Sequence, residues 1–146
     1  MRAVAADGVW KYFGDYPALR GASLEVAKGA CVALIGRNGA GKTTLLRILA
    51  GLSRPSKGAI SIKGPIGYLG HGIGVYDDLS AIENLTLFGR LAGLSNPKES
   101  AEAALEHVGL ARVKDGLARE FSRGMRQRLA IARAFLHNPW TWPFAT

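Results

Sequence analysis

The chain has 146 residues, of which 48% are hydrophobic and 21% charged, so it is long enough for one domain with its own core. Nineteen Lys and Arg against eleven Asp and Glu give a charge of +8, which suits nucleic acid, anionic lipid or a polyphosphate ligand. No low-complexity tract indicates disorder, no apolar run reaches the roughly 18 residues that span a bilayer, and the start lacks a signal-peptide core, so a cytosolic chain is expected.

The first part of the chain predicts a small sheet. Runs of β type at residues 9–13, 23–27 and 31–35 are separated by turns rich in Gly, Pro and Lys-Gly. Two later runs, 59–62 and 66–69, are also predicted to be strands. Cys31 lies in the apolar run A-C-V-A-L-I, so we expect a buried core residue and neither a disulfide nor a zinc site.

Four helices are predicted from apolar residues at helical spacing, at residues 42–50, 81–91, 98–108 and from about 122 to 137. Gly51 is expected to stop the first helix, and Asn96 with Pro97 to open the third. Residues 70–78 form a glycine-rich connector. Arginines cluster in the last helix without the interleaved aromatic residues of a base-stacking surface, so no nucleic-acid partner is expected.

Residues 36–44 read G-R-N-G-A-G-K-T-T, which fits the phosphate-binding pattern G-x-x-x-x-G-K-[ST] between a predicted strand and a predicted helix. Glycines let backbone N–H groups converge on phosphates, and the helix directs its positive end at them. We expect Lys42 to reach the β and γ phosphates, Thr43 to coordinate magnesium and Thr44 to contact the α phosphate. The predicted triphosphate site comprises Gly36, Arg37, Asn38, Gly39, Ala40, Gly41, Lys42, Thr43 and Thr44, with Thr43 as the metal ligand.

Several motifs before and after this loop occur in a characteristic order, and over roughly residues 3–139 the sequence resembles the ATP-binding subunits of ABC transporters. The resemblance implies an α/β P-loop NTPase of ABC type, with a small antiparallel β part, a parallel core sheet and a helical subdomain. It also implies ATP and Mg²⁺ as cofactors. In that family an aromatic residue about 29 positions before the lysine stacks on adenine, a position that Phe13 matches best. Tyr12, Tyr16 and Trp10 are possible substitutes, and the alternative for Phe13 is a core position.

Residues 121–139, F-S-R-G-M-R-Q-R-L-A-I-A-R-A-F-L-H-N-P, resemble the family signature L-S-G-G-Q and the helix after it. Ser122 and Gly124 match its Ser and second Gly, whereas Arg123 and Met125 replace its first Gly and its Gln. A helix start of this kind offers a hydroxyl and free N–H groups to a phosphate. The resemblance implies that Ser122 and Gly124 serve the ATP of a second ATP-binding subunit, in a homodimer attached to integral membrane transporter subunits at the inner face of the cell membrane.

His71 stands where the family has a Gln that touches magnesium and the attacking water and couples the site to the membrane partner. A neutral imidazole could take part of that role, and a surface histidine is the alternative. His71, the following Y-D-D-L-S-A-I-E-N-L and F-S-R-G-M-R-Q-R-L are together most similar to ATPase subunits of the haem exporters of cytochrome c maturation. Multidrug and polysaccharide exporters come next.

The family continues after the signature helix with an apolar strand, Asp-Glu and a later His, whereas this sequence reads H-N-P-W-T-W-P-F-A-T. The resemblance therefore implies one partial domain, with a β and P-loop part (1–70), a helical subdomain (71–121), a signature helix (122–138) and an aberrant tail (140–146). We expect a truncated or frame-shifted gene and a chain that turns over little ATP by itself. An ATP-binding-only or non-functional remnant and a soluble ABC ATPase that acts on DNA or ribosomes are the alternatives.

Overall fold

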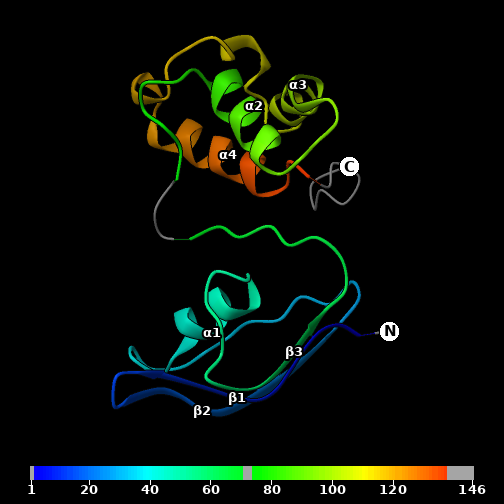
Figure 1. Cartoon of the computed structure of the whole chain (residues 1–146). Coiled ribbons are helices and arrows are strands. Elements are labelled where there is room, and N and C mark those ends of the chain that lie inside the picture. The colour runs from blue at the N-terminus through cyan, green and yellow to red at the C-terminus, as the bar shows by residue number, and fades with distance from the viewer. Residues whose placement is uncertain (1, 71–73, 138–146) are drawn as a thin grey trace. The chain divides into compact units, whose positions relative to one another are not determined.

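The structure is a computed structural model that describes residues 2–70 and 74–137, and it divides the chain into two compact units, Met1–Gly64 and Pro65–Thr146 (Figure 1). The first unit contains β1 (Arg2–Phe13), β2 (Tyr16–Ala27), α1 (Lys42–Leu49) and β3 (Lys57–Ile62). The strands form an antiparallel sheet in the order β2-β1-β3. The runs at 9–13, 23–27 and 59–62 are thus confirmed as strands, and all three strands begin earlier than predicted.

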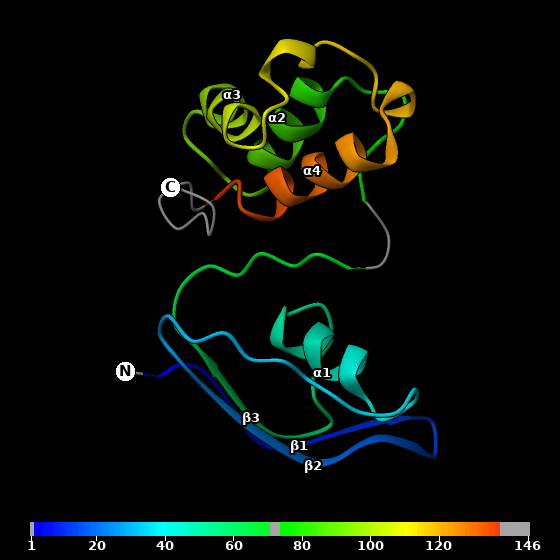
Figure 2. The same cartoon turned by 180° about the vertical axis from the view of Figure 1, so that it is seen from behind.

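The core of the first unit lies between this sheet and α1, which covers one face of it in both views (Figure 2). Leu45 and Ile48, one turn apart on α1, are buried against Val9 of β1 and Leu19 of β2. The helix ends as predicted, because Gly51 adopts a left-handed backbone with φ +73° directly after the last turn. This packing fixes the start of α1, and with it the glycine loop, above the sheet.

Two predicted strands do not form ladders. Residues 31–35 and 66–69 have no strand assignment, and every ladder among the described residues is antiparallel, so the parallel core sheet is not seen there. A strand depends on a hydrogen-bonding neighbour, and neither run is paired with a described strand. Ile35 is 93% exposed and Cys31 is exposed, so the prediction that Cys31 is a core residue was wrong.

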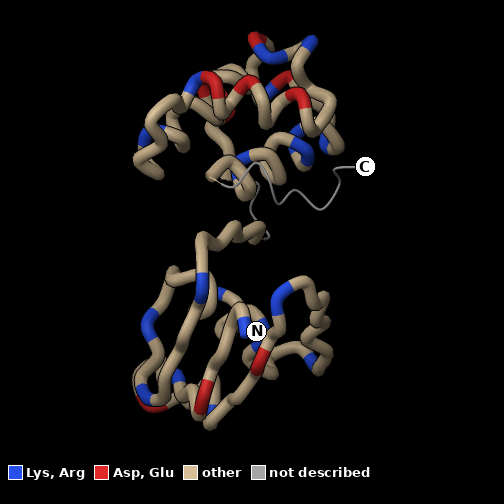
Figure 3. The backbone as a smooth tube through the Cα atoms, turned by 90° about the vertical axis from the view of Figure 1, so that its right-hand side faces the viewer, with Lys and Arg blue, Asp and Glu red and all other residues tan. Residues whose placement is uncertain are grey.

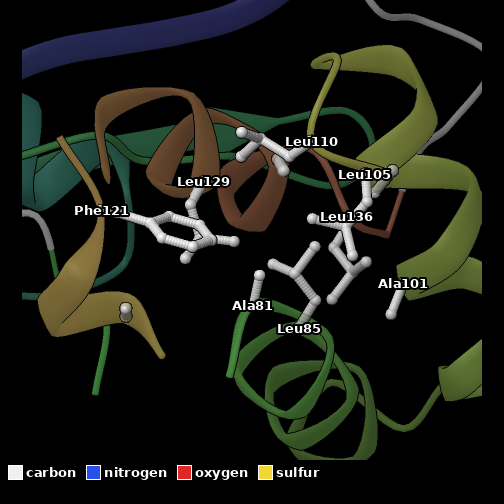
Figure 4. Packing of buried hydrophobic residues seen from close by; sticks show 11 residues of the cluster. Ala81, Leu85, Ala101, Leu105, Leu110, Phe121, Leu129 and Leu136 are labelled. Atoms are coloured by element: carbon white, nitrogen blue, oxygen red, sulfur yellow. The ribbon is translucent and has the colours of Figure 1, made fainter. Parts of the chain in front are cut away.

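The second unit is helical and contains α2 (Ala81–Leu91), α3 (Pro97–His107), the short 3-10 helices η1 (Ala111–Val113) and η2 (Ala118–Glu120), and α4 (Arg123–Ala134). α4 ends three residues earlier than predicted, and residues 138–146, which include the predicted tail, lie outside the described part. The helices meet around a cluster of apolar side chains from α2, α3, α4 and the connections between them (Figure 4). The fully or nearly fully buried members are Ala81, Leu85, Ala101, Ala104, Leu105, Leu110, Ala118, Phe121, Leu129, Ala132 and Leu136.

A capping box opens α2. The Ser80 hydroxyl accepts a hydrogen bond from the Glu83 N–H at 3.2 Å, and the Glu83 carboxylate accepts one from the Ser80 N–H at 2.8 Å. Asn96, by contrast, precedes α3 without a capping bond from its side chain, whereas Pro97 occupies the first turn as predicted. The start of α2 is therefore the better fixed of the two.

Replacing Glu83 with Ala is expected to lower the melting temperature at pH 7, with a smaller loss at acidic pH. The hydrogen bonds from Ser80 lower the pKa of Glu83 below its ordinary value of 4.5. A lowered pKa in the folded state stabilises the chain above pH 4.5, and this contribution disappears as the pH falls through the lowered pKa. Thermal unfolding of both proteins between pH 7 and pH 3 measures the difference. A difference that grows toward acid pH would contradict the assignment.

Candidate functional site

The glycine loop leads directly into α1 and lies against β2. Gly39 and Gly41 have φ values of +84° and +92°, a backbone conformation that residues with a Cβ rarely adopt. A Cβ added to Gly41 would lie 2.6 Å from the Ala18 carbonyl oxygen and 2.6 Å from Leu19 Cδ2. A Cβ on Gly39 would meet nothing within 4 Å. Gly41 is therefore required both for its backbone conformation and for the close approach to β2.

Lys42 folds back over the loop. Its Nζ donates hydrogen bonds to the Gly36 carbonyl at 2.6 Å and the Arg37 carbonyl at 2.7 Å. The Ala40 N–H donates to the same Arg37 carbonyl at 3.1 Å, which closes the turn. The ammonium group thus sits inside the curve of the loop backbone, and its third donor remains to hold a phosphate oxygen. The sequence prediction placed Lys42 in this role, and the structure adds the two carbonyls that orient it.

The start of α1 has a positive electrostatic potential that no side chain of its first turn offsets. Gly41 supplies no side-chain cap, and the first turn contains no acidic residue. Thr43 is exposed and Thr44 half-buried in that turn. Residues 1–64 contain ten Lys and Arg but only three Asp and Glu, whereas residues 65–146 contain nine and eight (Figure 3). Almost all of the net positive charge, +7 of +8, therefore belongs to the unit that carries the glycine loop, which favours a polyanionic ligand.

Two aromatic side chains near the β1–β2 turn are mostly exposed. Phe13 is 58% exposed, which excludes the core alternative for it, and Tyr16, its partner across the strands, is 61% exposed. The Lys11 ammonium lies 5.4 Å from the Phe13 ring centroid. Trp10 and Tyr12 are half-buried and stack on each other at 5.9 Å between centroids. Phe13 and Tyr16 are accordingly the better candidates for stacking on a base.

The predicted signature residues lie at the start of α4 in the second unit. Ser122 caps the helix, and its hydroxyl accepts a hydrogen bond from the Met125 N–H at 3.2 Å. Gly124 is exposed, and a Cβ added to it would meet nothing within 4 Å. The fold of the chain therefore does not itself require glycine there. His71 lies outside the described residues.

Sequence reasoning missed the contacts that support these sites. The approach of Ala18 and Leu19 to Gly41 depends on how β2 passes under the loop, and no local pattern marks it. Arg133, near the end of α4, donates a hydrogen bond from its guanidinium to the Gly74 carbonyl, whereas the sequence pattern marks it only as one of several arginines.

No helix in the ranges 2–70 and 74–137 is long and apolar enough to cross a membrane.

The sequence of this chain is similar to one protein family and to proteins that are described as ATP-binding. The family described as ABC transporter matches residues 19–142. The "ABC transporter ATP-binding protein NatA" of Bacillus subtilis is 42% identical over 84% of this chain and 56% of its own length. The "Cytochrome c biogenesis ATP-binding export protein CcmA 2" of Cupriavidus metallidurans is 38% identical over 88% of this chain and 67% of its own length. The chain thus spans little more than half of NatA.

A solved structure of the same kind of protein has a similar fold. A solved dimer of an ATP-binding cassette, described as a post-hydrolysis state bound to ADP and Pi, superposes with a TM-score of 0.79 at 26% identity. The match covers 93% of this chain and 70% of that one. The predicted fold class, an α/β P-loop domain, is confirmed by this likeness.

Proposed function

This chain belongs to the ABC transporter family, and on that premise we propose that it binds ATP with Mg²⁺ at Gly36–Thr44 as part of an ATP-binding subunit. The observation that carries the proposal is the position of the Lys42 ammonium inside the curve of the loop, bonded to the Gly36 and Arg37 carbonyls. A cation held there, beside the uncapped start of α1, binds phosphate groups with little reorganisation.

Each residue of the loop has a definite part in this function. The N–H groups of the loop and of the first turn of α1 bind the phosphates, with Lys42 on the β and γ groups and Thr44 on the α group. Arg37, Asn38 and Ala40 supply backbone N–H groups and the curvature of the loop. Phe13 stacks on the adenine. Mg²⁺, when bound, neutralises charge between the phosphates. The hydroxyl of Thr43, an exposed residue, would supply one oxygen ligand to the ion.

The proposal extends to a dimer. The exposed Ser122 and Gly124 at the start of α4 bind the γ phosphate of a nucleotide held by a second subunit, so that ATP binding closes the pair. Hydrolysis by the whole protein reopens it. The Asp-Glu pair and the later His that the family uses for this step do not occur in these 146 residues, so we expect this stretch to bind ATP without turning it over by itself. His71 contributes to the site in the proposed Gln position.

The transported substrate is a finer proposal. The likeness of the stretch after His71 and of residues 121–129 to haem-exporter ATPases, together with the similarity to CcmA 2, supports an exporter of the cytochrome c maturation type. The protein would then act at the inner face of the cell membrane with integral membrane subunits. Neighbouring genes test this: haem-exporter membrane subunits beside the gene would support the assignment, and drug or lipid permeases would overturn it.

Replacing Gly124 with Ala is expected to prevent ATP-dependent dimerisation without harming the fold. The added Cβ meets nothing within the chain and replaces a helical glycine, so stability should rise by up to about 1 kcal/mol. In the dimer, however, the methyl group would intrude between the helix start and the partner's phosphate. Sedimentation with ATP and Mg²⁺ should show dimers for the unchanged chain and at least tenfold weaker association for the variant.

The matched control is Gln127→Ala, an exposed position on the same helix. It should dimerise like the unchanged chain. Equal association of the Gly124 variant would refute the role of this helix start, and the absence of any ATP-dependent dimer would refute the proposed dimer itself.

A further inference from the structure

The last turn of α4 is approached closely by the chain that precedes α2, at two glycines. A Cβ on Gly67 would overlap the Ala134 carbonyl. Gly74 has φ +61°, and a Cβ there would overlap the Arg133 guanidinium, whose Nη1 donates to the Gly74 carbonyl. The backbone of Ala134 excludes a side chain at Gly67, whereas at Gly74 the positive φ disfavours one and the neighbouring atoms are the movable end of Arg133. The end of α4 therefore fits closely against this part of the chain at two separate points.

Arg133 is held in place by an aromatic pair as well. Its guanidinium carbon lies 4.1 Å from the ring centroid of Phe88 on α2, in the range of a strong cation–π contact. Phe88 in turn stacks on Tyr76, with 5.9 Å between centroids. One half-buried side chain thus joins α4, α2 and the segment between Gly74 and Tyr76.

The chain beyond Gly74 is tied to the same two helices. Asn84 of α2 is fully buried, and its side-chain amide forms two hydrogen bonds with the Tyr76 backbone. Its Oδ1 accepts from the Tyr76 N–H at 2.7 Å, and its Nδ2 donates to the Tyr76 carbonyl at 2.9 Å. Arg126 of α4 pairs with Asp77 at 2.6 Å. The segment Gly74–Leu79 therefore has contacts along α4, and Arg133 is the one at the end of the helix.

We propose that Arg133 is a positioning residue that couples the start of α4, where Ser122 and Gly124 lie, to the segment Gly74–Leu79. α4 has 12 residues and is about 18 Å long, and a helix of this length moves as a stiff rod. A shift of its first turn against a nucleotide is passed by Arg133 to Gly74 and by Phe88 to Tyr76. This inference rests on the proposed function, because it requires that α4 meets a bound nucleotide.

Hydrogen–deuterium exchange on the full chain, with and without ATP and Mg²⁺, tests the coupling in Arg133→Lys. Lysine keeps the charge but loses the planar stacking on Phe88 and the forked donors. In the unchanged chain, ATP should slow exchange in both the glycine loop and Gly74–Leu79. In the variant, exchange of Gly74–Leu79 should be about tenfold faster without nucleotide and no longer respond to ATP, while the glycine loop is still protected.

Two further variants make the result specific. Gly74→Ala removes the same contact from the other side and should give the same pattern. Arg128→Lys is the control, because Arg128 lies on the same helix but bonds the Val108 carbonyl, and it should behave like the unchanged chain. If ATP still slows Gly74–Leu79 in Arg133→Lys, the coupling role is wrong although ATP binding stands. If ATP protects nothing in the glycine loop of the unchanged chain, the proposed function fails and this inference with it.

Discussion

Replacement of Lys42 with Ala is expected to weaken ATP binding about ten- to hundredfold. A hydrogen bond to a charged group contributes about 1.5–3 kcal/mol, so the loss of one such bond from the Lys42 ammonium to the phosphates accounts for a change of this size. The ammonium is already held within the loop by the Gly36 and Arg37 carbonyls at 2.6 and 2.7 Å, so binding spends little free energy on ordering it. Equilibrium dialysis with labelled ATP and Mg²⁺ measures the loss directly.

Arg47→Ala is the matched control for Lys42. It removes the same charge from the same helix, but Arg47 is exposed in the last turn, away from the loop at its start. Affinity for ATP should change less than about threefold, because a solvent-exposed charge at this distance is largely screened. Equal losses in the two variants would show that ATP responds to net charge alone, and the specific role of Lys42 would be wrong.

Replacement of Gly41 with Ala is expected to destabilise the first unit by about 2–5 kcal/mol and to abolish detectable ATP binding. A residue with a Cβ loses about 1–2 kcal/mol in a left-handed conformation, and overpacking against Ala18 and Leu19 adds about 1–3 kcal/mol. Relief of the overlap requires the loop to move from β2, which displaces the start of α1. Exchange of amides in residues 1–64 during a urea titration reports the stability of this unit.

Gly39→Ala separates the two causes. Gly39 has a similar φ of +84°, but a Cβ there meets nothing within 4 Å, so only the backbone cost of about 1–2 kcal/mol remains. The difference between the two variants measures the close approach to β2. If both variants lose the same stability, the contact with Ala18 and Leu19 contributes nothing.

Local signals in the sequence predicted the helices well. α2 lies at its predicted residues, and α1 and α3 lie within one residue of theirs, because apolar spacing, Pro97 and Gly51 act within a few residues of the chain. The phosphate loop was predicted in the same way, from glycines and a lysine at short, fixed spacing before a helix. Signals of this kind need no knowledge of the rest of the fold.

Strands were predicted less well, because pairing is not local. β1 and β2 run for 12 residues each, through stretches such as A-V-A-A-D-G that show no clear β pattern, since each pairs with the other across a short turn. The apolar runs at 31–35 and 66–69 have the composition of strands but no partner among the described strands. Ile35 and Cys31 are therefore exposed, against the prediction from hydrophobicity alone.

The sequence by itself determined the helix that follows the glycine loop and the resemblance to ABC ATP-binding subunits, and it predicted phosphate binding at that loop, because these depend on residue type at short, fixed spacing. Only the tertiary structure decided why Gly41 must be glycine, which aromatic rings are exposed, and that Arg133 reaches Gly74 and Phe88. Those facts arise from segments that are distant in the chain and come together only when the sheet and the helices pack.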